Sequence, residues 1–181
     1  MCNRTSGWKR RACAAVTLMA AFDAALAQDV GLPGSSNVRI GNERAAGAVR
    51  RAVAGASERL KDPACNALLH RFRAASGRTL QENLEATGQS SEAYLTTRIF
   101  FYEGYKLPTC RTRRAKQGLA VTWPGNRAVY VCTTRFTDVE KRNPLEAQAI
   151  MIHEMLHTLG LGENPPTSNE ITDMVTEACV K

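Results

Sequence analysis

Apolar residues recur at helical spacing through the first half of the chain. Residues 43–61 are rich in alanine and place their valines and a leucine on one stripe, which predicts a helix. A second helix is expected at 63–75, because a proline suits its first turn and leucines form an apolar face. The capping-box pattern at 79–82 predicts a short helix that ends before Gly88, and another short helix is expected at 92–95.

A different pattern, aromatic and β-branched, begins at residue 98. Residues 98–102 predict a strand, and residues 119–123 and 128–132 predict two more. The tripeptide 124–126 (Pro-Gly-Asn) between the last two is typical of a tight turn. We therefore expect a short antiparallel sheet of about three strands.

Two longer helices are expected after the strands. Asn143 suits the N-cap of the first, which should run to about Leu159 and stop at Gly160. The capping box at 167–170 predicts the start of a final helix with an apolar face. Helices, then a small sheet, then helices again is the order of an α+β fold.

The first 27 residues have the organisation of a secretory signal peptide. Four basic residues precede an apolar run at 12–22, and the tripeptide 25–27 (Ala-Leu-Ala) is a small-residue cleavage site. A membrane anchor is the alternative, but this run is well short of the ~20 residues that span a bilayer. We expect residues 1–27 to be removed, residues 28–42 to be a flexible lead-in, and residues 43–181 to form one domain. The protein is then exported, to the periplasm or outside the cell, without a membrane span.

The charge of the chain changes once this segment is set aside. The formal net charge of +7 falls to +4, because residues 1–27 hold four of the basic residues and one aspartate. That modest charge does not favour a nucleic-acid partner. The basic clusters at 111–116 and 141–142 could bind an anionic envelope polymer, but solvated loops are the simpler interpretation.

Four cysteines remain outside the first 27 residues, and an oxidising compartment permits disulfides between them. Among the three possible pairings we favour Cys110–Cys132, which would join the ends of the expected hairpin region, and Cys65–Cys179, which would tie an early helix to the last. A structural zinc site is the alternative, but the chain has no C-x-x-C pair.

The motif that carries chemistry is H-E-x-x-H at residues 153–157, late in the well-capped helix. Its i, i+4 spacing puts His153 and His157 on one helical face, where both can reach one metal ion. The carboxylate of Glu154 can hold a water molecule beside the metal and take its proton. The alternative is a pair of structural core histidines, but these polar groups on a buried helix would be costly without a purpose.

A third protein ligand is needed, and because no histidine follows His157 the candidates are carboxylates, with no third protein ligand at all as the remaining alternative. Glu163 comes just after a Gly-Leu-Gly break, where the chain can turn back toward the same metal ion. Glu170 is a rival, although the capping box gives it another role. Asp173 and Glu177 are weaker rivals one and two turns further along.

The sequence HEMLHTLGLGE resembles the zincin metallopeptidases. It is most similar to the metzincin pattern H-E-x-x-H-x-x-G-x-x-H/D, which it matches at His153, Glu154, His157 and Gly160, and from which it departs at Glu163. The wider stretch 98–179 is similar to a set of small exported bacterial proteins of unassigned function.

This resemblance implies a small zincin-like domain and a zinc metalloendopeptidase. Zinc would be held by His153, His157 and Glu163, Glu154 would act as general base, and an edge strand would align a peptide or protein substrate. Tyr130 and Tyr105 are candidate oxyanion helpers, and we expect a monomer. One alternative is a catalytically weak zincin-fold envelope protein that binds metal or a partner. Another is an envelope protein stabilised by disulfides, in which the H-E-x-x-H motif has only a structural role.

Overall fold

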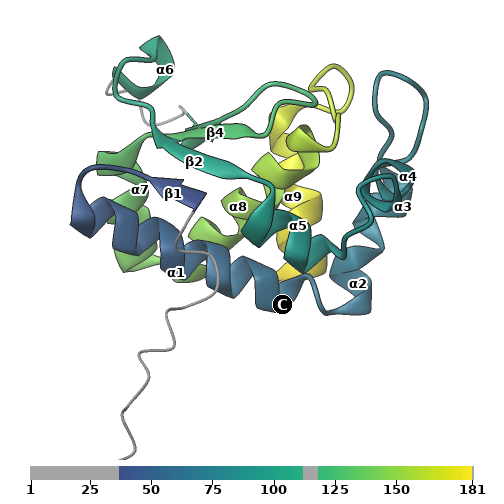
Figure 1. Cartoon of the computed structure of the whole chain (residues 1–181), viewed down its shortest axis with the longest axis horizontal. Coiled ribbons are helices and arrows are strands. Elements are labelled where there is room, and N and C mark those ends of the chain that lie inside the picture. Colours follow the sequence, from purple (N-terminus) through teal and green to yellow (C-terminus); the bar gives the residue numbers. More distant parts are fainter. Residues whose placement is uncertain (1–36, 112–117, 181) are drawn as a thin grey trace, which may run out of the picture. The chain divides into compact units, whose positions relative to one another are not determined.

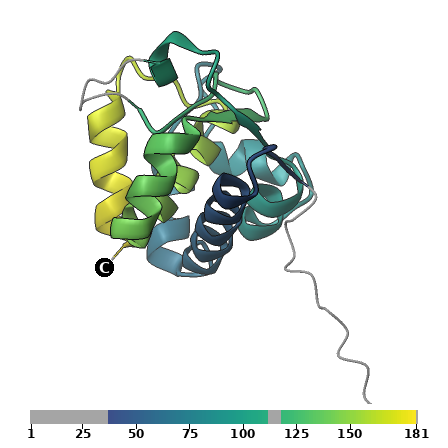
Figure 2. The same ribbon diagram turned by 90° about the vertical axis from the view of Figure 1, so that its left-hand side faces the viewer.

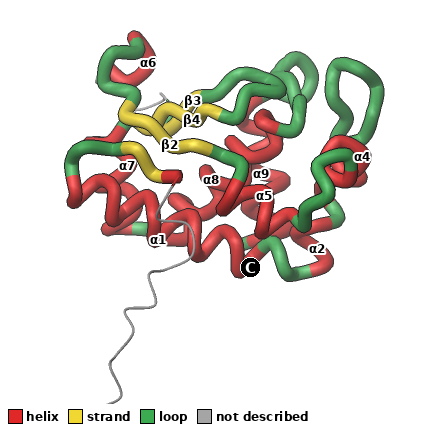
Figure 3. The backbone as a smooth tube through the Cα atoms, viewed as in Figure 1, coloured by secondary structure: helices red, strands yellow, loops and turns green. Residues whose placement is uncertain are grey.

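The computed structural model describes residues 37–111 and 118–180, and the fold is given for these residues. Four strands form one sheet in the order β1-β2-β4-β3. Figure 3 shows them side by side: β1 (Val38–Arg39), β2 (Phe100–Glu103), β3 (Ala120–Val121) and β4 (Ala128–Val131). The predicted signal peptide lies outside the described residues.

The sheet is mixed, so the predicted antiparallel sheet of about three strands is wrong. Both β1 and β4 run parallel to β2, and only β3 runs antiparallel to its neighbour β4. The turn at 124–126 correctly indicates the β3–β4 hairpin, but it carries no information about the direction of β2. Residues 37–42 of the predicted lead-in contain β1 and the N-cap of the first helix. A strand of two residues is too short to show an alternating pattern.

The helices that precede β2 correspond to the expected ones, with one difference. They are α1 (Glu43–Arg59), α2 (Pro63–Asn66), α3 (Leu68–Arg71), α4 (Leu80–Glu85) and α5 (Ser91–Thr97). The single helix expected at 63–75 is the two short helices α2 and α3. Phe72 leaves the helical conformation, and Arg73 then forms an isolated bridge with Thr79. The rest of that stretch becomes a turn.

The later helices are α6 (Pro108–Arg111), α7 (Thr133–Arg142), α8 (Pro144–Thr158) and α9 (Ser168–Cys179). The helices expected from 143 and from 167 are α8 and α9, each opened by its predicted cap. The sequence analysis predicted neither α6 nor α7. Within the described residues, no helix is long and apolar enough to cross a membrane.

The core lies between α1, α7, α8 and the sheet. Figure 1 shows these three helices together on one side of the sheet, and Figures 1 and 2 show α8 between α1 and α9. The inner face of α1 is mostly alanine, which allows close approach of its neighbours. From Met151 to Thr158 every residue of α8 is buried. The central helix of the fold is therefore the one that carries the H-E-x-x-H motif.

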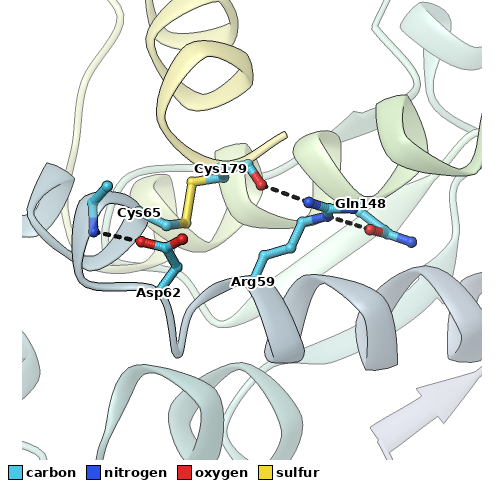
Figure 4. Close-up of a disulfide and its surroundings, with 6 residues drawn as sticks. Arg59, Asp62, Cys65, Gln148 and Cys179 are labelled. Carbon is cyan, nitrogen blue, oxygen red and sulfur yellow. Dashed lines mark hydrogen bonds between the residues drawn. A yellow bond between two sulfur atoms is a disulfide. The ribbon is translucent and has the colours of Figure 1, made fainter. Parts of the chain in front are cut away.

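The cysteines lie in the two pairs that the sequence analysis favoured. The sulfur atoms of Cys65 and Cys179 are at bonding distance, and so are those of Cys110 and Cys132. In Figure 4 the first pair joins α2 to the end of α9, and the Arg59 side chain donates to the Cys179 carbonyl and to the Gln148 side chain. Because the sulfur atoms of all four described cysteines are paired, none of these four is left for a thiolate zinc site.

Candidate metal centre

Helix α8 fixes the positions of His153, Glu154 and His157. Its N-terminus is capped by the Asn143 side chain, which accepts from the Glu146 amide in the first turn, and proline occupies its first position. All three side chains of the motif are about 95% buried. The i, i+4 spacing brings the two imidazole rings to a centroid separation of 4.7 Å.

The end of α8 is a Schellman turn that also orients His157. Gly160 adopts a φ of +108°, its amide donates to the His157 carbonyl, and the Leu161 amide donates to the Leu156 carbonyl. The reversed chain brings the Leu161 carbonyl within 2.8 Å of His157 Nδ1. A carbonyl oxygen only accepts, so Nδ1 carries the proton and Nε2 has a free lone pair.

The Nε2 atoms of the two histidines face each other at 2.9 Å. On its other side, His153 Nδ1 lies 3.0 Å from the hydroxyl oxygen of Thr172, which comes from α9. Both rings therefore have a partner at Nδ1 and present Nε2 to a common point. That is the arrangement by which protein groups orient histidine ligands of a metal ion.

Glu163 completes this group from the loop after the Schellman turn. Its Oε1 lies 3.3 Å from His157 Nε2 and 3.8 Å from His153 Nε2, and the side chain is about half exposed. Ligands at ~2.05 Å from a tetrahedral zinc are about 3.3 Å apart, which is close to these separations. Among the described residues, these three form the group that could hold a metal ion.

The rival carboxylates lie elsewhere. Glu170 accepts hydrogen bonds from the Thr167 amide and hydroxyl, so it serves the capping box of α9. Asp173 and Glu177 lie at exposed positions of the same helix. The structure therefore brings Glu163, and not its rivals, to the two histidines.

Glu154 is a buried acid beside this group. Burial raises its pKa to about 8, and the negative charge of Glu163 acts in the same direction, while a hydrogen bond from the Thr122 backbone opposes them. Its Oε2 atom is buried and has no hydrogen-bond partner within the described part of the chain. An orphaned buried oxygen is costly, and it fits a site that takes a water molecule or substrate. Burial and the nearby His157 lower the pKa of His153 to about 4, which keeps the imidazole neutral as a metal ligand requires.

The group opens into a cavity of about 990 Å³. One wall is the segment 118–124, which includes β3 at the edge of the sheet. The opposite walls come from the α7–α8 junction, including Arg142, and from the start of α9. A backbone bond from the Gly125 amide to the His157 carbonyl fixes the β3–β4 turn to the metal-site helix.

The two tyrosines considered as oxyanion helpers do not line this cavity. The ring of Tyr130 packs against those of Tyr102 and Trp123, and Tyr105 is 57% exposed. The sequence analysis did not anticipate Thr172 or Thr122, whose contacts with the motif join different elements. No local pattern marks either residue.

No family model matches the chain, and the comparisons with curated proteins and with solved structures gave no match.

Proposed function

We propose that this protein is an exported zinc-dependent peptidase, with His153, His157 and Glu163 as zinc ligands and Glu154 as general base. The observation that carries the proposal is the convergence of three ligand atoms beside a buried, unpartnered carboxyl oxygen at the base of a cavity.

Two imidazole nitrogens and one carboxylate oxygen are a donor set that zinc prefers, and three protein ligands are typical of catalytic zinc. The orientation of His157 by the Leu161 carbonyl supports this choice, because it leaves Nε2 available. Zinc bound there would polarise a substrate carbonyl and lower the pKa of water.

The protein's own residues supply the proton transfers. Glu154 accepts the proton of the attacking water through its unpartnered oxygen and then donates it to the leaving amine. A cation beside this carboxyl favours its ionised form, which is the form that can accept a proton.

An extended peptide is the substrate that suits the cavity. Strand β3 is an edge strand among the described strands and lies along the cavity wall. A peptide can add to such an edge through main-chain hydrogen bonds, which would bring its carbonyls past the metal site. The two cysteine pairs are compatible with an oxidising compartment and thus with export.

Metal content and proteolysis of three variants test the proposal. Glu154→Gln should keep one zinc per chain but lose hydrolysis of an unfolded protein substrate by about 10²- to 10⁴-fold. Glu163→Ala should lose zinc, and Glu170→Ala, which alters the rival carboxylate in the capping box, should keep it.

Two other results would change the conclusion. A wild-type protein that binds stoichiometric zinc but cleaves nothing would favour a catalytically weak metal- or partner-binding envelope protein. A wild-type protein that binds no zinc would refute both functions and leave the motif with a structural role.

A further inference from the structure

We infer that Thr172 is a positioning residue for the proposed zinc site, and that its hydroxyl orients the ring of His153 so that Nε2 faces the other two ligand atoms. The inference rests on the proposed function and adds a partner for the first histidine from a separate helix. It starts from two distances, 2.9 Å between the histidine Nε2 atoms and 3.0 Å between His153 Nδ1 and Thr172 Oγ1.

The tautomer of His157 is fixed by its surroundings. The Leu161 carbonyl requires the proton on Nδ1, so the Nε2 atom of His157 is an acceptor in the neutral ring. That Nε2 atom lies 2.9 Å from His153 Nε2 and 3.3 Å from Glu163 Oε1, so the three candidate ligand atoms face one another. His153 Nδ1 is on the other side of its ring and lies 3.0 Å from the Thr172 hydroxyl, which therefore sets the ring orientation that turns Nε2 toward this group.

Metal binding fixes which nitrogen of His153 carries the proton. A cation shared by both Nε2 atoms requires the lone pair of His153 Nε2, so the ring proton must be on Nδ1. Nδ1 then donates to the Thr172 oxygen. A hydroxyl can serve as donor or acceptor, whereas a carboxylate only accepts and an ammonium only donates. Threonine at this position can therefore partner His153 in either tautomer, and in the zinc-bound form it accepts from Nδ1.

Thr172 is also held firmly enough to orient a ring. Helix α9 is capped at its start by the Thr167–Glu170 capping box. Its end is joined to α2 through Cys179, whose carbonyl accepts from Arg59 (Figure 4). Buried Ile171, next to Thr172, belongs to the core. Helix α9 is thus fixed at both ends, with the hydroxyl directed at His153.

Zinc affinity of the full disulfide-bonded protein tests this role. Thr172→Val removes the hydroxyl at nearly constant volume and should weaken zinc binding about 10- to 100-fold in competition with a chromophoric chelator. Thr172→Ser should restore affinity close to wild type. Thr176→Val, the same change at an exposed position of α9, should leave it unchanged. Thermal unfolding of the metal-free variants, followed by circular dichroism, checks that each is folded.

The ring nitrogen shifts of His153 provide a second readout that does not depend on activity. In ¹⁵N spectra the zinc-bound protein should show the Nδ1–H tautomer of His153, with an Nδ1–H signal that shifts in Thr172→Val. Zinc affinity that is indifferent to Thr172→Val, or a zinc-bound protein in which His153 keeps its proton on Nε2, would overturn the inference while leaving the proposed peptidase intact. A wild-type protein that binds no zinc would refute the inference and the proposed function together.

Discussion

The buried carboxyl of Glu154 should make the stability of the metal-free protein fall as the pH rises above neutrality. Its pKa is raised from 4.5 to about 8 by burial, so between these values the folded state keeps a proton that the unfolded state releases. The free energy of unfolding decreases with pH wherever the folded state binds more protons.

His153 acts in the opposite direction at lower pH. Its pKa is lowered from 6.5 to about 4, so between these values the unfolded state binds the extra proton and stability rises with pH. The two effects oppose each other from about pH 4.5 to 6.5. Between pH 6.5 and 8 only the effect of Glu154 remains, at about 1.4 kcal/mol per pH unit. Over this interval the loss amounts to about 2 kcal/mol, a large fraction of the stability of a typical domain.

Urea unfolding in the presence of a chelator, with disulfides intact, measures this loss. Circular dichroism at several pH values from 6.5 to 8 should give a falling free energy of unfolding for the wild type. Glu154→Gln, which is neutral throughout, should remove the decrease and be the more stable protein at pH 8. Glu146→Gln, at an exposed position of the same helix, should keep the wild-type slope. Equal slopes for wild type and Glu154→Gln would show that Glu154 does not titrate as a buried acid, and the reasoning would fail.

Two further predictions concern the supports of the site helix. The buried Glu140 carboxylate of α7 accepts two 2.8 Å hydrogen bonds from Arg51, which lower its pKa. The stabilisation that the ionised Glu140 gives to the folded state is fully present above the ordinary pKa of a glutamate, and it is lost as the pH falls through the lowered pKa of Glu140. Glu140→Gln should therefore cost about 1–2 kcal/mol in urea unfolding at pH 7 and much less in acid, whereas an equal cost in acid would contradict this origin. Gly160→Ala should cost about 1–3 kcal/mol and weaken zinc binding, because φ is +108° and the new methyl would lie 3.0 Å from the Ala74 side chain. Gly162→Ala, which meets no atom within 4 Å, is its control, and similar losses for both would refute the explanation.

The parts of the site that the sequence predicted are those fixed by local geometry. The spacing of His153 and His157 follows from the helical repeat. Gly160 indicates a turn at the end of the same helix, and this turn brings Glu163 back to the two histidines. The partner of His153 could not be predicted in this way. Thr172 reaches the site only because α9 packs on α8, and that packing depends on contacts spread over both helices.

The difference between local and tertiary determinants also explains why α7 was not predicted and why the sheet was predicted to be antiparallel. Helix α7 begins with two threonines and has little intrinsic preference for a helix. It is stabilised by burial of Phe136 and by the Arg51–Glu140 pair, and both come from the tertiary structure. Strands β2 and β4 are parallel because the intervening chain crosses over, whereas the local sequence shows only the β3–β4 turn.

The two disulfides should differ in what they contribute, because they close chain segments of very different length. Cys65–Cys179 spans 114 residues and Cys110–Cys132 spans 22. Loop-closure entropy then predicts losses of about 5 and about 3 kcal/mol for the paired Cys→Ala variants in urea unfolding.

Zinc affinity should separate the two variants further. Cys179 anchors the end of the helix that carries Thr172, so the Cys65→Ala/Cys179→Ala variant should bind zinc more weakly than the Cys110→Ala/Cys132→Ala variant. Cys110 and Cys132 instead join α6, whose Thr109 lines the cavity, to the N-cap of α7, and neither belongs to the helix that carries Thr172. Equal zinc affinities in the two folded variants would mean that packing on α8 alone holds α9 in place. The long disulfide would then stabilise the fold without supporting the site.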